Sequence, residues 1–247
     1  MTPLKAMIGD AIAAVYAVAG PRDSAAGCRV LMYHAVGGKV VGDAQGLYSL
    51  APDLFARHVA VLKRCAVVPL SDGVARGQGV AVTFDDGYRD NLTAAAPLLV
   101  EAAVPFTVFV TPAFIESGEA QYLSRSDVAS LSRLPGVTIG AHGYSHTRLP
   151  ACDDAALARE LTDSRAWLED LLGVPVTTMS YPHGAVDDRV AAAAAAAGFA
   201  VAACSRFGRY RSGEDSYRVP RTDIWSFDGV RRLRAKVAGH WDWMAWR

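Results

Sequence analysis

The chain has 247 residues, of which 51% are apolar, and its 25 basic side chains balance its 25 acidic ones. This length and apolar content are enough for the buried core of one barrel-sized domain. The zero net charge argues against nucleic acid as a partner and favours a neutral substrate. The four cysteines are widely spaced, which argues against a thiolate zinc site and for reduced packing residues.

The first predicted element is an amphipathic helix over residues 4–16, ended by Gly20 and Pro21. Asp10 interrupts its apolar run, so the segment makes a poor signal peptide, and it is too short to span a bilayer. We therefore expect a cytoplasmic protein. The helix is expected to pack on its own domain or on a dimer partner, with membrane-surface contact as the alternative, although it has no cationic face of its own.

Strands and helices then alternate along the chain. Short apolar runs between glycine, proline or polar residues predict strands, and apolar side chains at helical spacing predict helices. Repeated strand-then-helix units require a parallel sheet, and about seven of them favour a closed or nearly closed barrel. The expected strands are 29–33, 67–68, 80–84, 106–110, 137–140, 177–181 and 199–203, and the expected helices are 52–65, 91–103, 126–134, 153–172, 186–197 and 227–238.

These elements divide the chain into three expected parts. Residues 1–27 form the first helix and a linker, and residues 28–226 form one α/β barrel domain. Residues 227–247 form a basic, Trp-containing tail, for which a solvated surface is the default interpretation. Because cationic and aromatic side chains occur together in this tail, contact with an anionic membrane surface or a glycolipid is the alternative.

Polar side chains follow three of the expected strands, and in a parallel barrel these strand ends converge on one rim. His142 and His146 are four residues apart, which on one helical turn would place both imidazoles on the same side. With a carboxylate they make a two-histidine, one-carboxylate set that leaves positions open on a metal. The three groups are Asp85-Asp86, His142-Gly143-Tyr144-Ser145-His146 and Tyr181-Pro182-His183-Gly184.

Asp85 and Asp86 would point to opposite sides of a strand, so a turn at Gly87 is needed if both serve one site. One carboxylate could then bind a metal while the other deprotonates water, the arrangement expected for metal-assisted hydrolysis of an amide or ester. The alternative is that one aspartate caps the helix that follows.

The ordered motifs Thr83-Phe84-Asp85-Asp86-Gly87, His142-x-x-x-His146 and Tyr181-Pro182-x-Gly184 resemble those of the polysaccharide deacetylases of carbohydrate esterase family four. The resemblance covers about residues 28–225 and implies a distorted (β/α) barrel that removes N-acetyl groups from sugars. It implies Zn²⁺ as the metal, with Co²⁺ or Ni²⁺ as alternatives. The implied roles are general base for Asp85, metal ligand for Asp86, His142 and His146, and oxyanion donor for the backbone N–H of His183. The alternatives for His183 are a ring that faces the substrate and an additional metal ligand.

Two departures from the family pattern need a substitute. Ser180 stands where many members have an arginine that bonds the catalytic aspartate, and Arg221 is our candidate replacement, with a surface salt bridge as the alternative. The family's late histidine has its expected counterpart in His34, because in a closed barrel the first strand neighbours the last. This resembles the permuted arrangement of poly-N-acetylglucosamine deacetylases. By this resemblance His34 is the general acid, and the nearby charge of Asp223 would favour its protonated form. The alternative is that His34 is a core histidine bonded to a backbone carbonyl.

The predicted function is metal-dependent removal of the N-acetyl group from an acetamido sugar in a polysaccharide, an oligosaccharide or a carrier-linked glycan. Two alternatives remain: hydrolysis of a formyl group or an O-acetyl ester at the same site, and a catalytically weak carbohydrate-binding barrel, since Ser180 replaces the arginine. Packing is the alternative role for the aromatic members of the expected sugar-binding set. That set is Tyr144, Tyr181, Pro182, Arg221, Asp223 and Trp225.

Overall fold

The computed structural model describes residues 3–20 and 27–246, so the expected linker at residues 21–26 lies outside the described residues. Seven strands form one sheet in the order β8-β7-β6-β5-β4-β1-β9, and every paired neighbour runs parallel. A separate parallel pair, β2 with β3, flanks the loop between them. The strands are β1 (Cys28–Tyr33), β2 (Ala35–Val36), β3 (Ser49–Leu50), β4 (Gly79–Phe84), β5 (Phe106–Val110), β6 (Val137–Ala141), β7 (Thr178–Ser180), β8 (Val201–Ala203) and β9 (Arg221–Asp223).

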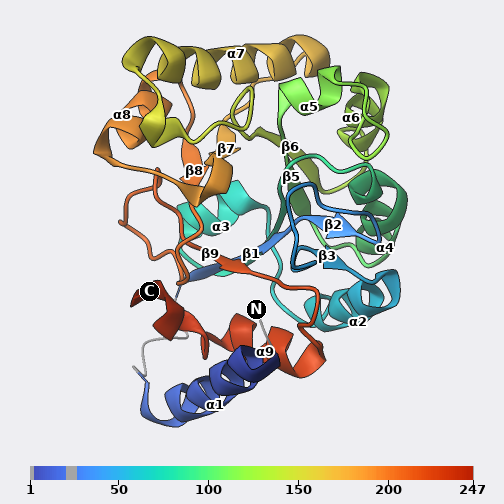
Figure 1. Ribbon diagram of the computed structural model, residues 1–247, viewed down its shortest axis with the longest axis vertical. Coiled ribbons are helices and arrows are strands. Elements are labelled where there is room, and N and C mark those ends of the chain that lie inside the picture. Colours follow the sequence, from blue (N-terminus) through green and yellow to red (C-terminus); the bar gives the residue numbers. More distant parts are fainter. Residues whose placement is uncertain (1–2, 21–26, 247) are drawn as a thin grey trace.

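The sheet nearly closes into a barrel (Figure 1). β1 pairs with β4 on one side and with β9 on the other, so the first strand neighbours the last, as the sequence predicted. On the far side, the Cys204 N–H donates to the Val219 carbonyl at 2.9 Å, and the Val219 N–H donates to the Ala202 carbonyl at 3.0 Å. These bonds join the end of β8 to the segment just before β9. The predicted distorted (β/α) barrel of parallel strands is confirmed.

Helices connect the strands and cover the outside of the sheet. The longest of those described, α7, begins after Asp153, whose side chain accepts the N–H of Ala156, and ends at Gly173, which has a positive φ of 69°. The helices are α1 (Pro3–Ala19), α2 (Pro52–Leu62), α3 (Leu70–Arg76), η2 (Asn91–Ala95), α4 (Ala96–Glu101), α5 (Pro112–Glu116), α6 (Arg125–Leu131), η3 (Leu149–Ala151), α7 (Asp154–Leu172), η4 (Pro182–Gly184), α8 (Asp188–Ala196), α9 (Val230–Ala238) and η5 (Asp242–Trp246).

One expected strand is absent from the sheet. Residues 67–68 contribute only an isolated bridge between Val67 and Val80. Pro69 follows directly as the N-cap of α3, which leaves too little chain for a strand. The prediction of a strand at 67–68 was wrong, and β9 supplies the seventh strand instead.

The C-terminal segment packs on the barrel. Arg29 of β1 is fully buried and holds both carboxylate oxygens of Asp242, at 2.7 and 2.8 Å. Lys236 of α9 is also fully buried and donates to the Asp223 carbonyl at 2.7 Å and to the Asp228 carboxylate. The default expectation of a solvated tail was therefore wrong for Lys236, because a buried carboxylate lies beside it. The division into three parts stays a prediction.

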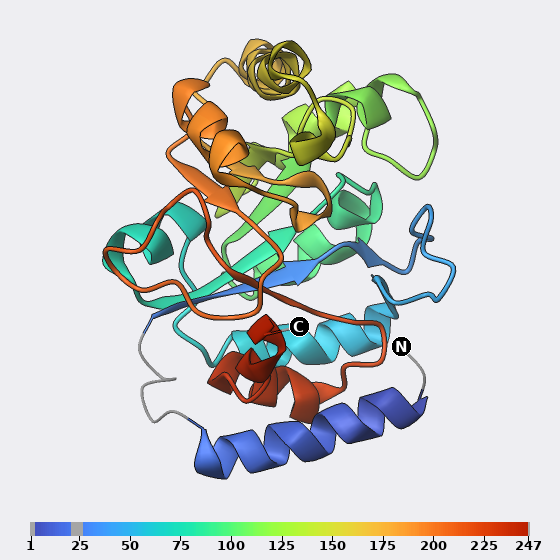
Figure 2. The ribbon, with the colours of Figure 1, turned by 60° about the vertical axis from the view of Figure 1, so that its left-hand side comes forward.

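α1 forms the outermost layer at one end of the molecule, beside α9, and α7 lies at the opposite end (Figures 1 and 2). Within the described ranges, none of the helices combines the length and apolar character needed to cross a membrane.

Candidate active site

The carboxyl ends of β1, β4, β6, β7 and β9 border one cavity of about 530 Å³. The loop between β2 and β3, from Val40 to Tyr48, forms a further wall. The three groups of polar residues that follow β4, β6 and β7 meet here, as expected for parallel strands of one barrel. The cavity brings together His34, Asp85, Asp86, His142, His146, His183 and Asp223.

The backbone at this cavity is strained at several points. Asp86, His146 and His183 have φ values of 72°, 62° and 58°, in the left-handed region that side chains rarely adopt. Ala103 is the fourth such non-glycine residue in the described chain, and it lies elsewhere. Such conformations persist where the surrounding structure enforces them, which is typical of binding and catalytic sites. Asp86 and Gly87, also at φ 72°, together make the turn that the sequence assigned to Gly87 alone.

Asp86, His142 and His146 have the geometry of a metal-binding cluster, since one ligand atom from each lies within 4.8 Å of the others. Oδ1 of Asp86 is 3.4 Å from Nε2 of His142 and 3.2 Å from Nε2 of His146. This oxygen is buried and makes no hydrogen bond. A buried carboxylate oxygen that lacks a donor but faces two ring nitrogens fits a divalent cation.

The charge balance of the cluster also favours a cation. Burial alone would raise the pKa of Asp86, but the facing rings of His142 and His146 hold it well below its ordinary value. Burial alone would lower the pKa of His142, yet the charges of Asp85 and Asp86 raise it. Both shifts show that the carboxylates stabilise positive charge at the ring nitrogens, which either a proton or a metal ion could supply.

Ser180 orients the ring of His142. Nδ1 of His142 lies 2.9 Å from the Ser180 carbonyl and 2.6 Å from its hydroxyl. Because a carbonyl only accepts hydrogen bonds, we assign the proton to Nδ1, which leaves the Nε2 lone pair directed at Asp86. This is the orientation that a metal-binding histidine requires.

A loop, and not a helical turn, brings His142 and His146 together. Residues 142–146 form no helix, and Gly143 and His146 both have positive φ. The two ring centroids lie 5.0 Å apart. The prediction based on helical spacing was therefore wrong in its mechanism, although both side chains do reach one cluster.

Asp85 is held by Arg221, which reaches it from β9. The Arg221 guanidinium donates from Nη1 to Oδ1 at 2.7 Å and from Nη2 to Oδ2 at 2.8 Å. Arg221 is fully buried, so the alternative of a surface salt bridge was wrong. The Ser180 hydroxyl adds a hydrogen bond to Oδ1 at 3.3 Å. Burial alone would raise the pKa of Asp85, but the charges of Arg221 and His142 lower it, so the carboxylate is ionised at neutral pH.

His34 and Asp223 lie on the side of the cavity formed by β1 and β9. Nδ1 of His34 and Oδ1 of Asp223 are buried, and neither has a hydrogen-bond partner among the residues described. The His34 ring packs against Tyr48, with centroids 4.6 Å apart. Burial raises the pKa of Asp223. Because these two polar atoms lack partners, each is free to form a hydrogen bond with a polar group bound at this wall.

His183 lies beside the cluster of Asp86, His142 and His146. Its ring meets that of His146 edge to face, with centroids 4.6 Å apart. Burial, and then the neighbouring His146, lower the pKa of His183, so its ring is neutral at neutral pH.

Five residues of the expected sugar-binding set do not line the cavity, and one of these, Arg221, is the buried partner of Asp85. Tyr181 is fully buried and donates its hydroxyl to the Tyr217 carbonyl at 2.8 Å. Trp225 is buried beneath Lys236, whose Nζ lies 3.5 Å from the ring centroid. A buried ring offers no face to a sugar, so the prediction was wrong for Tyr181 and Trp225. Tyr144 donates its hydroxyl to Glu116 at 2.8 Å and Pro182 is buried, and neither lines the cavity.

Glu160 of α7 supports the histidine loop and was missed by the sequence analysis. Its Oε2 accepts the backbone N–H groups of Tyr144 at 2.8 Å and Ser145 at 2.9 Å, and its Oε1 accepts the Ser145 hydroxyl at 2.5 Å. One carboxylate thus fixes the backbone between His142 and His146. No local pattern in α7 distinguishes this glutamate from its solvated neighbours.

We expect Glu160→Gln to weaken Zn²⁺ binding by about tenfold, because an amide accepts fewer of these hydrogen bonds and the histidine loop loosens. Competition with a chromophoric chelator measures the affinity. Glu101→Gln, an exposed change at the end of α4, is the matched control. Equal zinc affinity in Glu160→Gln and Glu101→Gln would contradict this role for Glu160.

Comparison with known sequences identifies relatives of the chain. The model of the polysaccharide deacetylase family matches residues 72–202, more than half of the chain. The chain is 25% identical over 145 residues to YxkH of Bacillus subtilis, a polysaccharide deacetylase by name, covering 59% of this chain and 51% of that protein. It is 29% identical over 117 residues to chitin deacetylase 1 of Cryptococcus neoformans, covering 47% and 23%. The chain thus spans about half or less of these curated relatives.

Solved structures show the same fold. The deacetylase PplD of Streptococcus pyogenes, in complex with acetate, superposes with a TM-score of 0.77 at 20% identity, covering 85% of this chain and 98% of that one. IcaB of Ammonifex degensii superposes with a TM-score of 0.71 at 21% identity, covering 88% and 97%.

Proposed function

This chain belongs to the polysaccharide deacetylase family, and we propose that it is a metal-dependent hydrolase that removes the N-acetyl group from an acetamido sugar. The observation that carries the proposal is the pair of unequal carboxylates at the end of β4. Asp85 accepts two hydrogen bonds from Arg221, whereas Asp86 faces His142 and His146. The substrate would be a polysaccharide, an oligosaccharide or a carrier-linked glycan.

We assign the metal to Asp86, His142 and His146, with Zn²⁺ as the expected ion and Co²⁺ or Ni²⁺ as alternatives. When bound, such an ion polarises the acyl carbonyl and makes water more acidic. The donor set of two imidazoles and one carboxylate leaves coordination positions for water and substrate.

The remaining steps fall to side chains and one backbone group. Asp85 accepts a proton from the attacking water, since the two hydrogen bonds from Arg221 keep this carboxylate ionised and oriented. The water oxygen bonds to the acyl carbon, and the backbone N–H of His183 donates to the oxyanion that forms. His34 gives a proton to the sugar nitrogen as the C–N bond breaks, and the products are acetate and the amino sugar.

The cavity lining agrees with an uncharged sugar. It carries four aspartates and four histidines, but neither lysine nor arginine belongs to the described lining. The aspartates of this wall repel a substrate that carries a phosphate or carboxylate. They accept a neutral sugar, and also the ammonium group of its deacetylated product.

An acyl-release assay tests the proposed function. Purified protein loaded with Zn²⁺, Co²⁺ or Ni²⁺ should release acetate from N-acetylglucosamine oligomers. Formamido sugars and O-acetylated xylan test the same site on other acyl groups, and faster release from either would reassign the substrate. Glycan binding without any acyl release, in protein shown to contain metal, would identify a carbohydrate-binding barrel instead.

We expect Zn²⁺ to stabilise the fold against heat. At about a hundred times its dissociation constant, the ion should add about 2.7 kcal/mol to the free energy of unfolding, because it binds the folded site only. Differential scanning fluorimetry with and without chelator measures the shift in Tm. His146→Gln should abolish it, and His240→Gln, outside the cavity, should keep it. A wild-type Tm that zinc leaves unchanged would contradict the metal assignment.

A further inference from the structure

The outer face of α1 is an exposed apolar ridge. Of the six exposed large hydrophobic side chains in the described chain, four lie on this helix, and the other two, Val41 and Val174, lie elsewhere. The inner face of α1 is already packed, since a Cβ on Gly9 would come within 2.7 Å of the Trp241 ring and Ala13 is buried beside it. The α1 ridge consists of Met7 (69% exposed), Ile8 (49%), Val15 (67%) and Val18 (88%).

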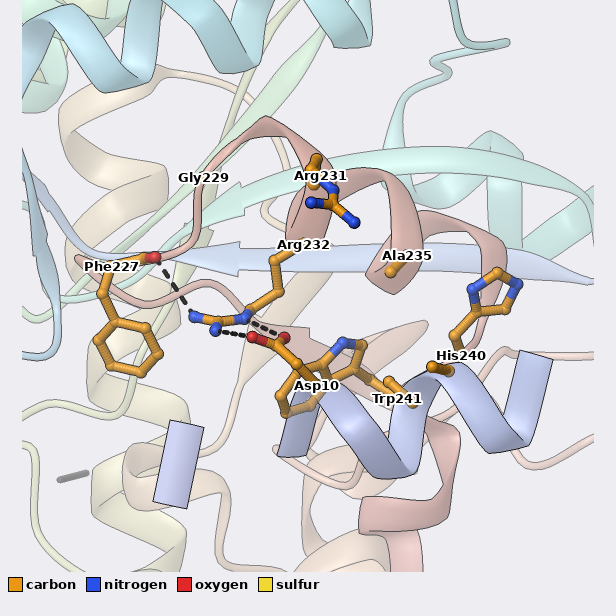
Figure 3. Close-up of a pocket in the computed structure, with 10 residues that line it drawn as sticks. Asp10, Phe227, Gly229, Arg231, Arg232, Ala235, His240 and Trp241 are labelled. Atoms are coloured by element: carbon orange, nitrogen blue, oxygen red, sulfur yellow. Dashed lines mark hydrogen bonds and ion pairs between the residues drawn. The ribbon is translucent and has the colours of Figure 1, made fainter. Parts of the chain in front are cut away.

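A cationic groove adjoins α1, the helix that carries the ridge, and Figure 3 shows the residues that line this groove. It encloses about 460 Å³ between α1 and α9, with Asp10 on one side and Arg231, Arg232 and His240 on the other. Asp10 is neutralised by Arg232, whose Nε donates to Oδ1 at 2.8 Å. Arg231 is exposed and forms no ion pair with any described residue, so the groove keeps an unbalanced positive charge.

This combination of surfaces favours one kind of occupant. An apolar helix face that lies beside the exposed Arg231 matches a bilayer interface, where acyl chains meet anionic headgroups. In a two-fold dimer the same surface of each copy forms the contact, so the two grooves would face one another. Their like charges would repel, which disfavours a second copy as the occupant.

We propose that the α1 ridge and the groove dock this protein on an anionic phospholipid surface. The ridge enters the acyl boundary, and Arg231 binds a lipid phosphate at the mouth of the groove. The proposal is independent of the hydrolytic function, because its residues lie outside the cavity that holds Asp85 and the histidines.

Vesicle co-sedimentation with the full chain tests the proposal. Wild-type protein should sediment with phosphatidylcholine vesicles that contain phosphatidylglycerol, and salt or removal of the phosphatidylglycerol should reduce the bound fraction. Val18→Asp should lower the vesicle affinity by about tenfold or more, because a carboxylate replaces the most exposed side chain of the ridge. Val174→Asp, a change at another exposed valine (56%) after α7, is its control.

Arg231→Gln tests the electrostatic part separately. Loss of one arginine near the anionic surface should lower the affinity by about fivefold. Arg133→Gln, exposed after α6, is the matched control and should bind as the wild type does. Val18→Asp and Arg231→Gln are both expected to leave the Tm and acyl release unchanged.

Three results would overturn the proposal. These are failure of the wild type to bind either kind of vesicle, equal binding by Val18→Asp and the wild type, and a dimer in sedimentation velocity that Val18→Asp dissociates in the absence of lipid. The last result would identify the ridge as an interface between two copies.

Discussion

Asp85→Asn is expected to lower acetate release by about 10²-fold to 10⁴-fold while the protein keeps its metal. Asparagine nearly matches aspartate in shape, but its amide cannot accept the proton of the attacking water. The substitution leaves Asp86, His142 and His146 unchanged, so the metal content should stay at the wild-type level. The measurement is kcat for acetate release, together with metal analysis of the same sample.

Asp170→Asn, an exposed change on α7, is the matched control for Asp85→Asn and should keep full activity. Full turnover by Asp85→Asn would show that another group takes the proton. Loss of metal together with activity would instead show that Asp85 belongs to the metal site, which would contradict the unequal roles of the two carboxylates.

Arg221→Met is expected to lower the free energy of unfolding by about 3–5 kcal/mol, because it leaves the buried Asp85 carboxylate without its partner. Four hydrogen bonds are lost: two to Asp85, one from Nε to the Cys204 carbonyl at 3.1 Å and one from Nη1 to the Thr83 hydroxyl at 3.4 Å. Activity should also fall, since Asp85 loses its orientation. Urea unfolding followed by circular dichroism measures the stability.

The double variant Asp85→Asn with Arg221→Met separates the charge from the packing. It should recover part of the lost stability, because no unpaired charge remains in the core. If the double variant is as unstable as the sum of the two single changes, the ion pair is not the source of the effect.

The stability contribution of the Asp85–Arg221 pair should depend on pH in a defined direction. The native pKa of Asp85 lies below the ordinary value of 3.8. The contribution is therefore fully present above that ordinary value and is lost as the pH falls through the lower native pKa. The difference in unfolding free energy between the wild type and Arg221→Met should accordingly shrink on acidification.

Local sequence determined the rim and most of the strands, with β9 as the exception in the main sheet. Apolar runs predicted β4 and β5, and their burial on both faces explains why these runs are nearly continuous. Because parallel strands present their carboxyl ends on one side, the sequence also predicted that Asp85, His142 and His183 approach one another. The β1–β9 pairing brings His34 to the same rim, as a permuted barrel requires.

Other features depend on contacts that no local pattern specifies. Arg221 reaches Asp85 only because β9 pairs with β1 in the register that sets Arg221 opposite Val30. Glu160 belongs to a different helix from the loop that it supports. Tyr181 and Trp225 look like sugar-binding rings in the sequence, but packing against neighbouring elements buries them.

The α1 ridge shows the same limit. The sequence identified an amphipathic first helix without a cationic face, and a basic segment at the other end of the chain. Only the fold places Asp10 beside Arg232, 222 residues away, and so joins the apolar ridge to the cationic groove. The sequence by itself therefore determined the barrel and the residues at its rim, because short-range periodicity and parallel topology fix them. The tertiary structure decided which side chains pair, which are buried and which surfaces adjoin, because these depend on distances between segments that are far apart in the chain.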